Sequence, residues 1–342
     1  MPTNKTVMKA AIGLHVLCER AGSPQPEVAS PFAPNPYLLL RLDEPGGAMS
    51  AEEVAACVRW LRRQCCPVIA IAPPAAHPSL QQACDVVLAD AAQAEPLLEN
   101  VRRAPLAAMT LVQLLRATEH MTVEQGLLME SFAYATLQGG PESRRWLDRQ
   151  GVRHRRHGDP GPAVVMERSG ARLNIRLNRP SRRNAVSVEM RDALCEALEF
   201  VVADASIATA RISGNGPCFS SGGDLGEFGT APDPATAHAV RSLRQPASVL
   251  LRCVERVEFI VHGACVGAGA ELPAFSRRVY AHPDAYFQLP EIGFGLIPGA
   301  GGCISLPRRI GRQRTAYMAL STARVDAGRA LEWGLVDSIA GA

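Results

Sequence analysis

Three glycine-rich segments, residues 218–225, 262–272 and 289–302, contain the residue types best suited to chemistry. They read CFSSGGDL, HGACVGAGAEL and LPEIGFGLIPGAGG. Glycine at this density lets the backbone approach a ligand closely and leaves N–H groups free to point at it. Gly267 and Gly269 resemble the start of a dinucleotide fingerprint, but Leu272 occupies its third glycine position, so that fingerprint fails.

Two carboxyl side chains, Glu271 and Glu291, lie in the second and third segments. A positioned acid or base accelerates proton transfer by about 10²–10⁴-fold. Taken alone, Glu271 at the start of a helix is typical of a dipole complement, and Glu291 after Pro290 is typical of a turn at a strand end. Only the complete set of motifs favours a catalytic role for both.

Together with residues 177–187 (LNRPSRRNAVS), the three segments resemble the enoyl-CoA hydratase/isomerase (crotonase) family in order and spacing. The resemblance covers the carboxy-terminal half of the chain and rests on several motifs, which makes it specific. It implies an α/β crotonase (ClpP-like) fold, a spiral of ββα units. It also implies a site that binds an acyl thioester of coenzyme A and stabilises its enolate.

The resemblance implies an oxyanion hole made by the backbone N–H groups of Gly223 and Ala268. Negative charge develops on the thioester oxygen, and one such donor is typically worth about 10²–10³ in rate. Family members often have glycine at the second position. Alanine keeps the N–H, so we expect Ala268 to serve as well.

The same resemblance assigns Glu271 to orienting and activating a water, and Glu291 to exchanging a proton with the α-carbon. Two carboxyl groups in one dry pocket raise each other's pKa. Further substrate-binding residues are implied by position: Arg182, Arg183, Asn184, Gly222, Asp224, Gly267, Pro298 and Gly299.

Several of these residues have simpler interpretations. Arg182 and Arg183 could bind coenzyme A phosphates or form a solvated turn, and Asp224 could cap the next helix. His154 and His157 have HxxH spacing, but no other ligand type accompanies them, which favours a solvated linker and no metal.

The elements that must position these residues alternate between strand and helix, as in an α/β protein. We expect strands over residues 172–177, 209–213 and 258–262 and a helix over 187–202. A further helix should begin at residues 298–302. The catalytic domain is predicted to span residues 164–342, after a polar linker over residues 151–163.

The amino-terminal half has its own pattern. Residues 1–36 are proline-rich and suggest a weakly ordered leader. Strands are predicted over residues 37–42, 68–72 and 84–89, with a helix from Ser50, where Ser50 and Glu53 form a capping box. Residues 94–147 are helical in pattern, with breaks near Pro105, residues 121–122 and residues 139–141.

Residues 38–45 (LLLRLDEP) echo residues 173–180 (LNIRLNRP), which suggests a duplicated unit. In the family, several helices come after the point that matches residues 334–337, whereas here residues 104–149 resemble those helices. We therefore predict that residues 37–150 are a shortened crotonase-like copy that supplies a helical roof. Circular permutation is the simpler alternative, but it leaves the echo unexplained.

The composition of the 342 residues excludes several classes of function. The net charge of +3, without a dense basic tract, does not indicate nucleic-acid binding. No apolar run approaches the ~20 residues of a membrane span, and no signal peptide is evident. The ten scattered cysteines indicate reduced thiols and a cytoplasmic protein.

The leading hypothesis is an enoyl-CoA hydratase, because both glutamates are present. An isomerase or an acyl-CoA hydrolase could use the same oxyanion hole, and a non-catalytic acyl-CoA-binding subunit is a third possibility. The resemblance implies no cofactor beyond the coenzyme A of the substrate. It also implies a homo-oligomer, trimer or hexamer.

Overall fold

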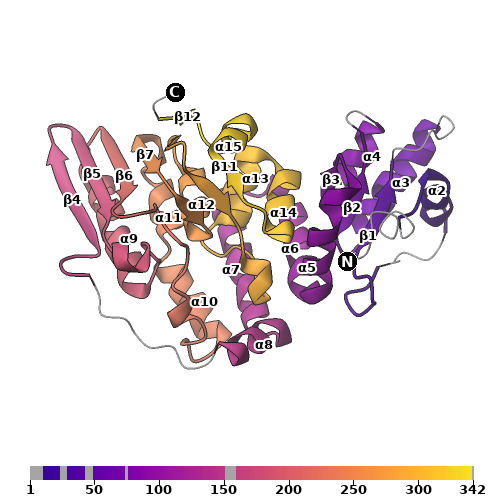
Figure 1. Ribbon diagram of the computed structural model, residues 1–342, viewed down its shortest axis with the longest axis horizontal. Helices are drawn as coiled ribbons and strands as arrows, with labels where there is room; N and C mark the ends of the chain where they lie inside the picture. Colours follow the sequence, from indigo (N-terminus) through magenta and orange to yellow (C-terminus); the bar gives the residue numbers. More distant parts are fainter. Residues whose placement is uncertain (1–10, 24–28, 43–48, 74–75, 151–158, 341–342) are drawn as a thin grey trace.

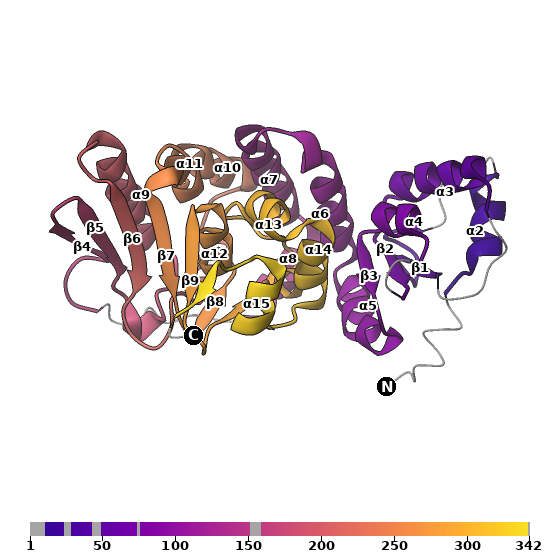
Figure 2. The ribbon, with the colours of Figure 1, turned by 90° about the horizontal axis from the view of Figure 1, so that it is seen from above.

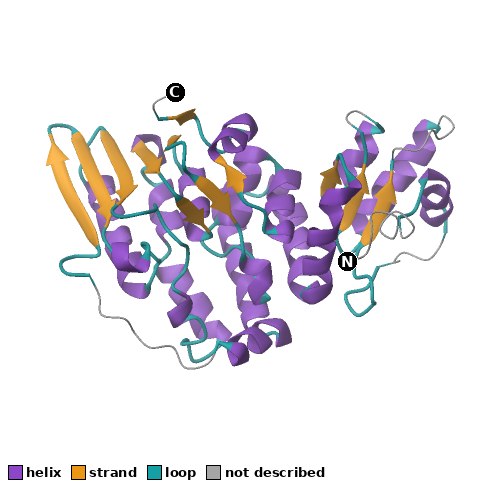
Figure 3. Cartoon of the chain, in the orientation of Figure 1, coloured by secondary structure: helices purple, strands orange, loops and turns teal. Residues whose placement is uncertain are grey.

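The molecule is elongated, with a largely parallel β-sheet near each end and a layer of helices between them (Figures 1 and 2). The computed structural model describes residues 11–23, 29–42, 49–73, 76–150 and 159–340. Strands and helices alternate through both ends, so the predicted α/β class is confirmed (Figure 3). No helix in these five ranges is long and apolar enough to cross a membrane.

The amino-terminal half consists of a small sheet unit and four helices that we call the roof helices. The small sheet unit contains α2 (Leu14–Ala21), β1 (Leu38–Arg41), α3 (Ala51–Arg63), β2 (Val68–Ile71), α4 (Pro78–Ala83) and β3 (Val86–Leu88). The roof helices are α5 (Ala94–Arg103), α6 (Pro105–Ala117), α7 (Val123–Gln138) and α8 (Pro141–Arg149). The three strands and the helix breaks predicted here are confirmed.

The beginning of the chain differs from the prediction. Residues 14–21, expected in a weakly ordered leader, form α2, and Ile12 pairs with Leu40 beside β1. Leu14 and Leu17 are buried against α3 and the small sheet. Burial of these two leucines stabilises a short helix that proline-rich surroundings alone would not predict.

The capping box at the start of α3 is confirmed. The Ser50 hydroxyl accepts a hydrogen bond from the Glu53 backbone N–H (3.2 Å), and the Glu53 carboxylate accepts one from the Ser50 N–H (2.8 Å). Each cap satisfies an N–H that the first helical turn leaves without a partner.

The two faces of the small sheet contact different hydrophobic cores. The three strands are parallel, in the order β1-β2-β3. Leu40 and Ala70 pack with α2 and α3, whereas Leu39 and Ile69 belong to the core that contains the roof helices. Side chains alternate across a strand, so the sheet is buried on both sides.

The carboxy-terminal half is built on two sheets. The six-stranded sheet has the order β12-β9-β7-β6-β5-β4, and the second has the order β11-β10-β8. The strands are β4 (Val164–Ser169), β5 (Arg172–Leu177), β6 (Thr209–Gly214), β7 (Val257–Val261), β8 (Ala264–Val266), β9 (Arg278–Ala281), β10 (Tyr286–Gln288), β11 (Val325–Asp326) and β12 (Ser338–Ile339). The helices are α9 (Val188–Ala203), α10 (Pro234–Leu243), α11 (Pro246–Leu251), α12 (Ala268–Glu271), α13 (Gly302–Ile310), α14 (Arg312–Ser321) and α15 (Ala327–Trp333).

The predicted strands over residues 172–177, 209–213 and 258–262, and the helices from residues 187 and 298–302, are confirmed. β4, β9, α10, α11, α14 and α15 are among the elements that were not predicted. The linker prediction over residues 151–163 includes 151–158, and these residues, with His154 and His157, lie outside the described ranges.

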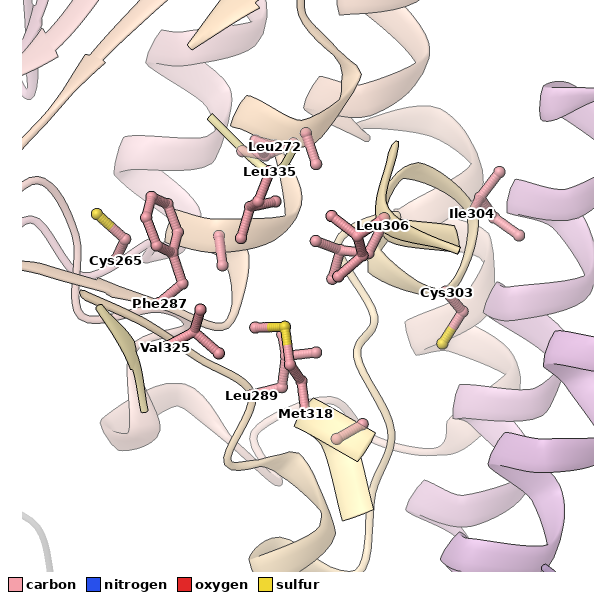
Figure 4. Packing of buried hydrophobic residues seen from close by; sticks show 14 of the residues in the cluster. Cys265, Leu272, Phe287, Leu289, Cys303, Ile304, Leu306, Met318, Val325 and Leu335 are labelled. Atoms are coloured by element: carbon pink, nitrogen blue, oxygen red, sulfur yellow. The ribbon is translucent and has the colours of Figure 1, made fainter. Parts of the chain in front are cut away.

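One continuous hydrophobic core joins the roof helices to the carboxy-terminal half. Phe287 from β10, Leu306 from α13 and Met318 from α14 meet in it (Figure 4). Leu111 of α6 and Leu127 of α7 belong to the same cluster of buried side chains. The roof helices therefore share the core of the carboxy-terminal half, although they precede it in the chain.

A buried ion cluster fixes the small sheet unit to the rest. Asp85, only 1% exposed, accepts hydrogen bonds from Val68 N (2.8 Å), Arg116 Nε (2.8 Å) and Arg312 Nη1 (2.9 Å). These donors come from β2, α6 and α14. Removing one member of such a cluster leaves a buried charge without compensation, so the cluster specifies how the three elements pack.

Candidate active site

Two left-handed glycines shape the loops that precede the predicted oxyanion donors. Gly222 has φ of 88° and Gly267 has φ of 49°. A Cβ on Gly222 would lie 2.8 Å from Val266 O, and one on Gly267 would lie 2.6 Å from Glu291 Oε1. Neither position accepts a side chain, which explains glycine before each donor.

The donors themselves come next in the chain. Among the described residues, the backbone N–H groups of Gly223 and Ala268 have no hydrogen-bond acceptor. Ala268 is the first residue of α12, where the helix offers its N–H no partner. Both residues line the same cavity. Two N–H groups without acceptors among the described residues therefore belong to one cavity wall, and their binding of a single ligand oxygen stays a prediction.

This cavity has a volume of about 410 Å³ and is formed by both halves of the chain. Tyr134 and Gln138 come from α7, and the carboxy-terminal half supplies Glu271 and Glu291 with a largely apolar surround. Other residues of its wall are Val186, Val188, Arg191, Asp224, Phe228, Ala237, Val240, Arg241 and Gly299. A mostly apolar cavity with a few polar groups is typical of a small-molecule site.

Glu271 is a buried carboxylate held by the backbone. Its Oε2 accepts hydrogen bonds from Ala300 N (2.7 Å) and Gly302 N (2.8 Å). Burial raises the pKa of Glu271, and the two N–H donors oppose that effect, leaving the pKa at about 7. The side chain can therefore be an anion at neutral pH.

Glu291 has the opposite environment. Its Oε2 is buried and has no hydrogen-bond partner among the described residues. Burial, together with the negative charge of Glu271, raises the pKa of Glu291 well above its usual range. Two neighbouring carboxyl groups with such different surroundings have different affinities for a proton, which is the arrangement that acid–base chemistry requires.

A third carboxyl group, Glu130 of α7, extends the arrangement. Its two oxygens accept from Gly301 N (2.7 Å) and Cys303 N (2.8 Å). Four successive N–H groups, from residues 300 to 303, therefore alternate between Glu271 and Glu130. Burial and the charge of Glu271 raise the pKa of Glu130. Glu130 of the roof therefore binds the same segment, residues 300–303, that binds Glu271.

Asp224 and Gly299, two residues predicted to bind substrate, line the cavity. Asp224 also caps the short 3₁₀ helix after it, through Gly226 N (2.8 Å), and it pairs with Arg182 at 3.3 Å. A Cβ on Gly299 would lie 2.4 Å from the Tyr134 ring, so glycine here lets α7 approach.

The other predicted contacts lie outside the cavity wall. The Asn184 side chain is fully buried and donates to the carbonyls of residues 215, 218 and 219, so it holds the first glycine-rich loop internally. Arg183 is exposed, and Arg182 is half-buried. Pro298 is buried and precedes α13. Binding of substrate by these four stays a prediction.

Sequence reasoning gave no site role to Glu130, Tyr134 or Arg241. Glu130 and Tyr134 are four residues apart and share one face of α7, and a carboxylate within a buried helical stretch was the available signal. Arg241 lies on α10, a helix that the sequence did not predict. Their convergence depends on packing between distant segments.

The protein-family model described as "Enoyl-CoA hydratase/isomerase" matches residues 167–342. This range includes all the site residues of the carboxy-terminal half. The chain belongs to the enoyl-CoA hydratase/isomerase family. The crotonase fold predicted for this half is thereby confirmed.

Similar proteins in the family differ in their reactions. The chain is 34% identical over 176 residues to 2,3-dehydroadipyl-CoA hydratase from Escherichia coli, covering 52% of this chain and 68% of that protein. It is 29% identical to the mitochondrial Delta(3,5)-Delta(2,4)-dienoyl-CoA isomerase of Mus musculus, covering 49% of this chain and 55% of that protein. A crystal structure of enoyl-CoA hydratase from Thermoplasma volcanium superposes with a TM-score of 0.49 and 31% identity, over 53% of this chain and 73% of that one.

Proposed function

We propose that the protein is an enoyl-CoA hydratase, which adds water across the 2,3 double bond of an enoyl-CoA thioester. The observation that carries the proposal is the contrast between Glu271 and Glu291. Glu271 Oε2 accepts hydrogen bonds from two backbone N–H groups, whereas Glu291 Oε2 is buried and has no partner among the described residues. Hydration of a double bond needs a base that removes a proton from water and an acid that protonates the α-carbon.

In the proposed reaction, the Glu271 carboxylate removes a proton from water while the water oxygen bonds to the β-carbon. The π electrons shift toward the α-carbon, and negative charge develops on the thioester oxygen. The N–H groups of Gly223 and Ala268 stabilise that charge. Glu291 then gives its proton to the α-carbon, and a proton passes from Glu271 back to Glu291 to restore the site.

An isomerase is the second candidate, because a similar protein is a dienoyl-CoA isomerase and Glu291 alone could move a proton between two carbons. The test compares Glu271→Gln and Glu291→Gln with the unchanged protein. Hydration of 2-enoyl-CoA and isomerisation of 3-enoyl-CoA are followed by ultraviolet absorbance, and binding of a saturated acyl-CoA is the control.

For a hydratase, we expect both variants to lose at least about 10²-fold in turnover while still binding the saturated ligand. The kcat/KM of the unchanged protein should rise with pH through about 7, as Glu271 ionises. Loss of activity in Glu291→Gln alone would favour isomerase, and release of free thiol would favour hydrolase. Binding without any turnover would favour a non-catalytic subunit.

We also propose a cytoplasmic homo-oligomer, a trimer or hexamer, in which coenzyme A enters only as part of the substrate. The family resemblance supports this proposal. Light scattering coupled to size exclusion measures the oligomer directly, and a monomeric mass would contradict it.

A further inference from the structure

Arg241 of α10 lines the cavity that Glu271 and Glu291 also line. Its Nε donates to Ser131 Oγ (3.1 Å), Nη1 to Gln138 Oε1 (3.0 Å) and Nη2 to the Ser131 carbonyl (3.3 Å). The guanidinium carbon lies 4.7 Å from the centre of the Tyr134 ring. A guanidinium has five N–H donors, so donors beyond these three hydrogen bonds remain for a ligand.

The charge of Arg241 has no carboxylate partner within ion-pair distance among the described residues. By contrast, Arg191, the other arginine of the cavity wall, pairs with Asp192 at 2.8 Å. The oxygens of Glu130 accept from backbone N–H groups at the start of α13 instead. Burial lowers the pKa of Arg241, which means that its surroundings oppose the positive charge.

The neighbouring contacts also hold the guanidinium in place. Arg241 can only donate, so the Ser131 hydroxyl accepts from it and can give its own hydrogen to His238 Nδ1, 2.8 Å away. Ser131 and Gln138 belong to α7, so the guanidinium is fixed between a roof helix and α10. An anion that enters the cavity meets a cation already oriented for it.

Most of the surface around Arg241 is apolar, with Val186, Val188 and Val240 among the lining residues. Arg182 and Arg183, the arginines predicted to contact coenzyme A, do not line this cavity. An apolar acyl chain with a neutral end would leave Arg241 without a carboxylate at ion-pair distance among the described residues. A chain that ends in a carboxylate would pair with it.

We propose that Arg241 is a specificity-determining residue that selects acyl-CoA thioesters with a carboxylate at the far end of the acyl chain. This inference rests on the proposed function, since it names the substrate class of the same site. Arginine suits the task because its planar donors bind a carboxylate through charge-assisted hydrogen bonds.

Calorimetric binding tests the proposal without requiring turnover. The ligands are saturated pairs of equal chain length: glutaryl- and pentanoyl-CoA, adipyl- and hexanoyl-CoA, and suberyl- and octanoyl-CoA. We expect the protein to bind the carboxylate member of at least one pair at least about tenfold more tightly. In Arg241→Met the preference should reverse, because an unpaired carboxylate is costly in an apolar cavity.

Two further variants complete the test. Arg241→Lys keeps the charge and should retain part of the preference. Arg244→Met removes a charge from an exposed position near the end of α10 and should leave the preference unchanged. The affinity of Arg241→Met for hexanoyl-CoA should stay within about twofold of the unchanged protein, because a methionine still fills the apolar wall.

Equal affinities within every pair would overturn the proposal. So would an equal loss of affinity for both members of each pair in Arg241→Met, because that result would show a purely structural tie between α7 and α10. A retained carboxylate preference without turnover of any enoyl-CoA would refute the proposed hydratase and leave this inference standing. Failure to bind any acyl-CoA would refute both.

Discussion

The unit β1–α3–β2 near one end of the molecule and the unit β5–α9–β6 near the other have the same plan. In each, two parallel strands flank a helix that begins after a serine cap, Ser50 or Ser187. The two units differ beyond the second strand. After β6 comes the loop with Gly222 and Gly223, whereas β2 leads through a short segment into α4. The strand–helix–strand scaffold therefore exists here both with and without the site.

The roof helices follow the small sheet unit in the chain, but they pack with the carboxy-terminal half. They share the core of the carboxy-terminal half and place Tyr134 in its cavity. This arrangement fits both a shortened duplicate and a permuted chain, and the duplication stays a prediction.

The largest expected effect comes from separating the units. A fragment of residues 161–342 should aggregate and lose acyl-CoA binding, because it exposes the core that the roof helices cover. Each buried leucine lost is worth about 2–5 kcal/mol, against about 5–15 kcal/mol of total stability. A fragment of residues 11–342 keeps the roof helices and the Asp85 ion cluster and should bind measurably. Solubility and calorimetry measure both, and a soluble, active 161–342 fragment would show that the roof is dispensable.

The next effect concerns Ala268 of α12, the second proposed oxyanion donor, which lies in the carboxy-terminal half. Ala268→Pro removes one proposed donor at the first position of α12, where proline fits a helix well. We expect turnover to fall by about 10²–10³-fold. Ala268→Gly keeps the N–H and should change turnover little. Circular dichroism verifies folding, and a folded, active proline variant would exclude Ala268 as a donor.

A smaller effect is expected where the roof meets the site. In Glu130→Gln, one of the two carboxylate oxygens that accept from Gly301 N and Cys303 N becomes an NH₂ group, which cannot accept a hydrogen bond. Turnover should fall roughly tenfold, and stability by about 1–3 kcal/mol. Glu142 of α8 offers a matched control, since it accepts from Leu106 N (2.8 Å) and Ala107 N (3.0 Å) at the start of α6.

Glu142→Gln should cost similar stability but leave turnover nearly unchanged. Chemical unfolding and steady-state kinetics on both variants separate the two effects. Equal losses of turnover in the two variants would mean that Glu130 acts only through general stability.

The smallest effect is expected from removing the serine caps of α3 and α9, which can be compared directly. Ser50 accepts from Glu53 N, and Ser187 accepts from Met190 N, both at 3.2 Å. Ser50→Ala and Ser187→Ala should each cost about 1 kcal/mol in urea unfolding. Neither should change turnover by more than about twofold. A marked loss of turnover in Ser50→Ala would indicate that the small unit influences the site.

The sequence predicted much of the local structure because the causes are local. The break at Pro105 reflects a missing N–H, and the capping box of α3 depends on residues three apart. Prediction failed at α2, whose helix depends on burial of Leu14 and Leu17 by residues further along the chain. Gly223 and Ala268 as oxyanion donors and the two glutamates as catalytic groups stay predictions, and the sequence supports them because their motifs are contiguous.

The sequence by itself determined which residues could do chemistry: the glycines that free two N–H groups, and Glu271 and Glu291 beside them. Only the tertiary structure decided how those groups behave. Glu130 lies more than a hundred positions before Glu271, yet the two share the N–H groups of one helix start. Arg241 meets the cavity because α7 and α10 pack together. Charge, burial and the pKa of a carboxyl group depend on neighbours in space, and those neighbours come from segments that the chain order keeps apart.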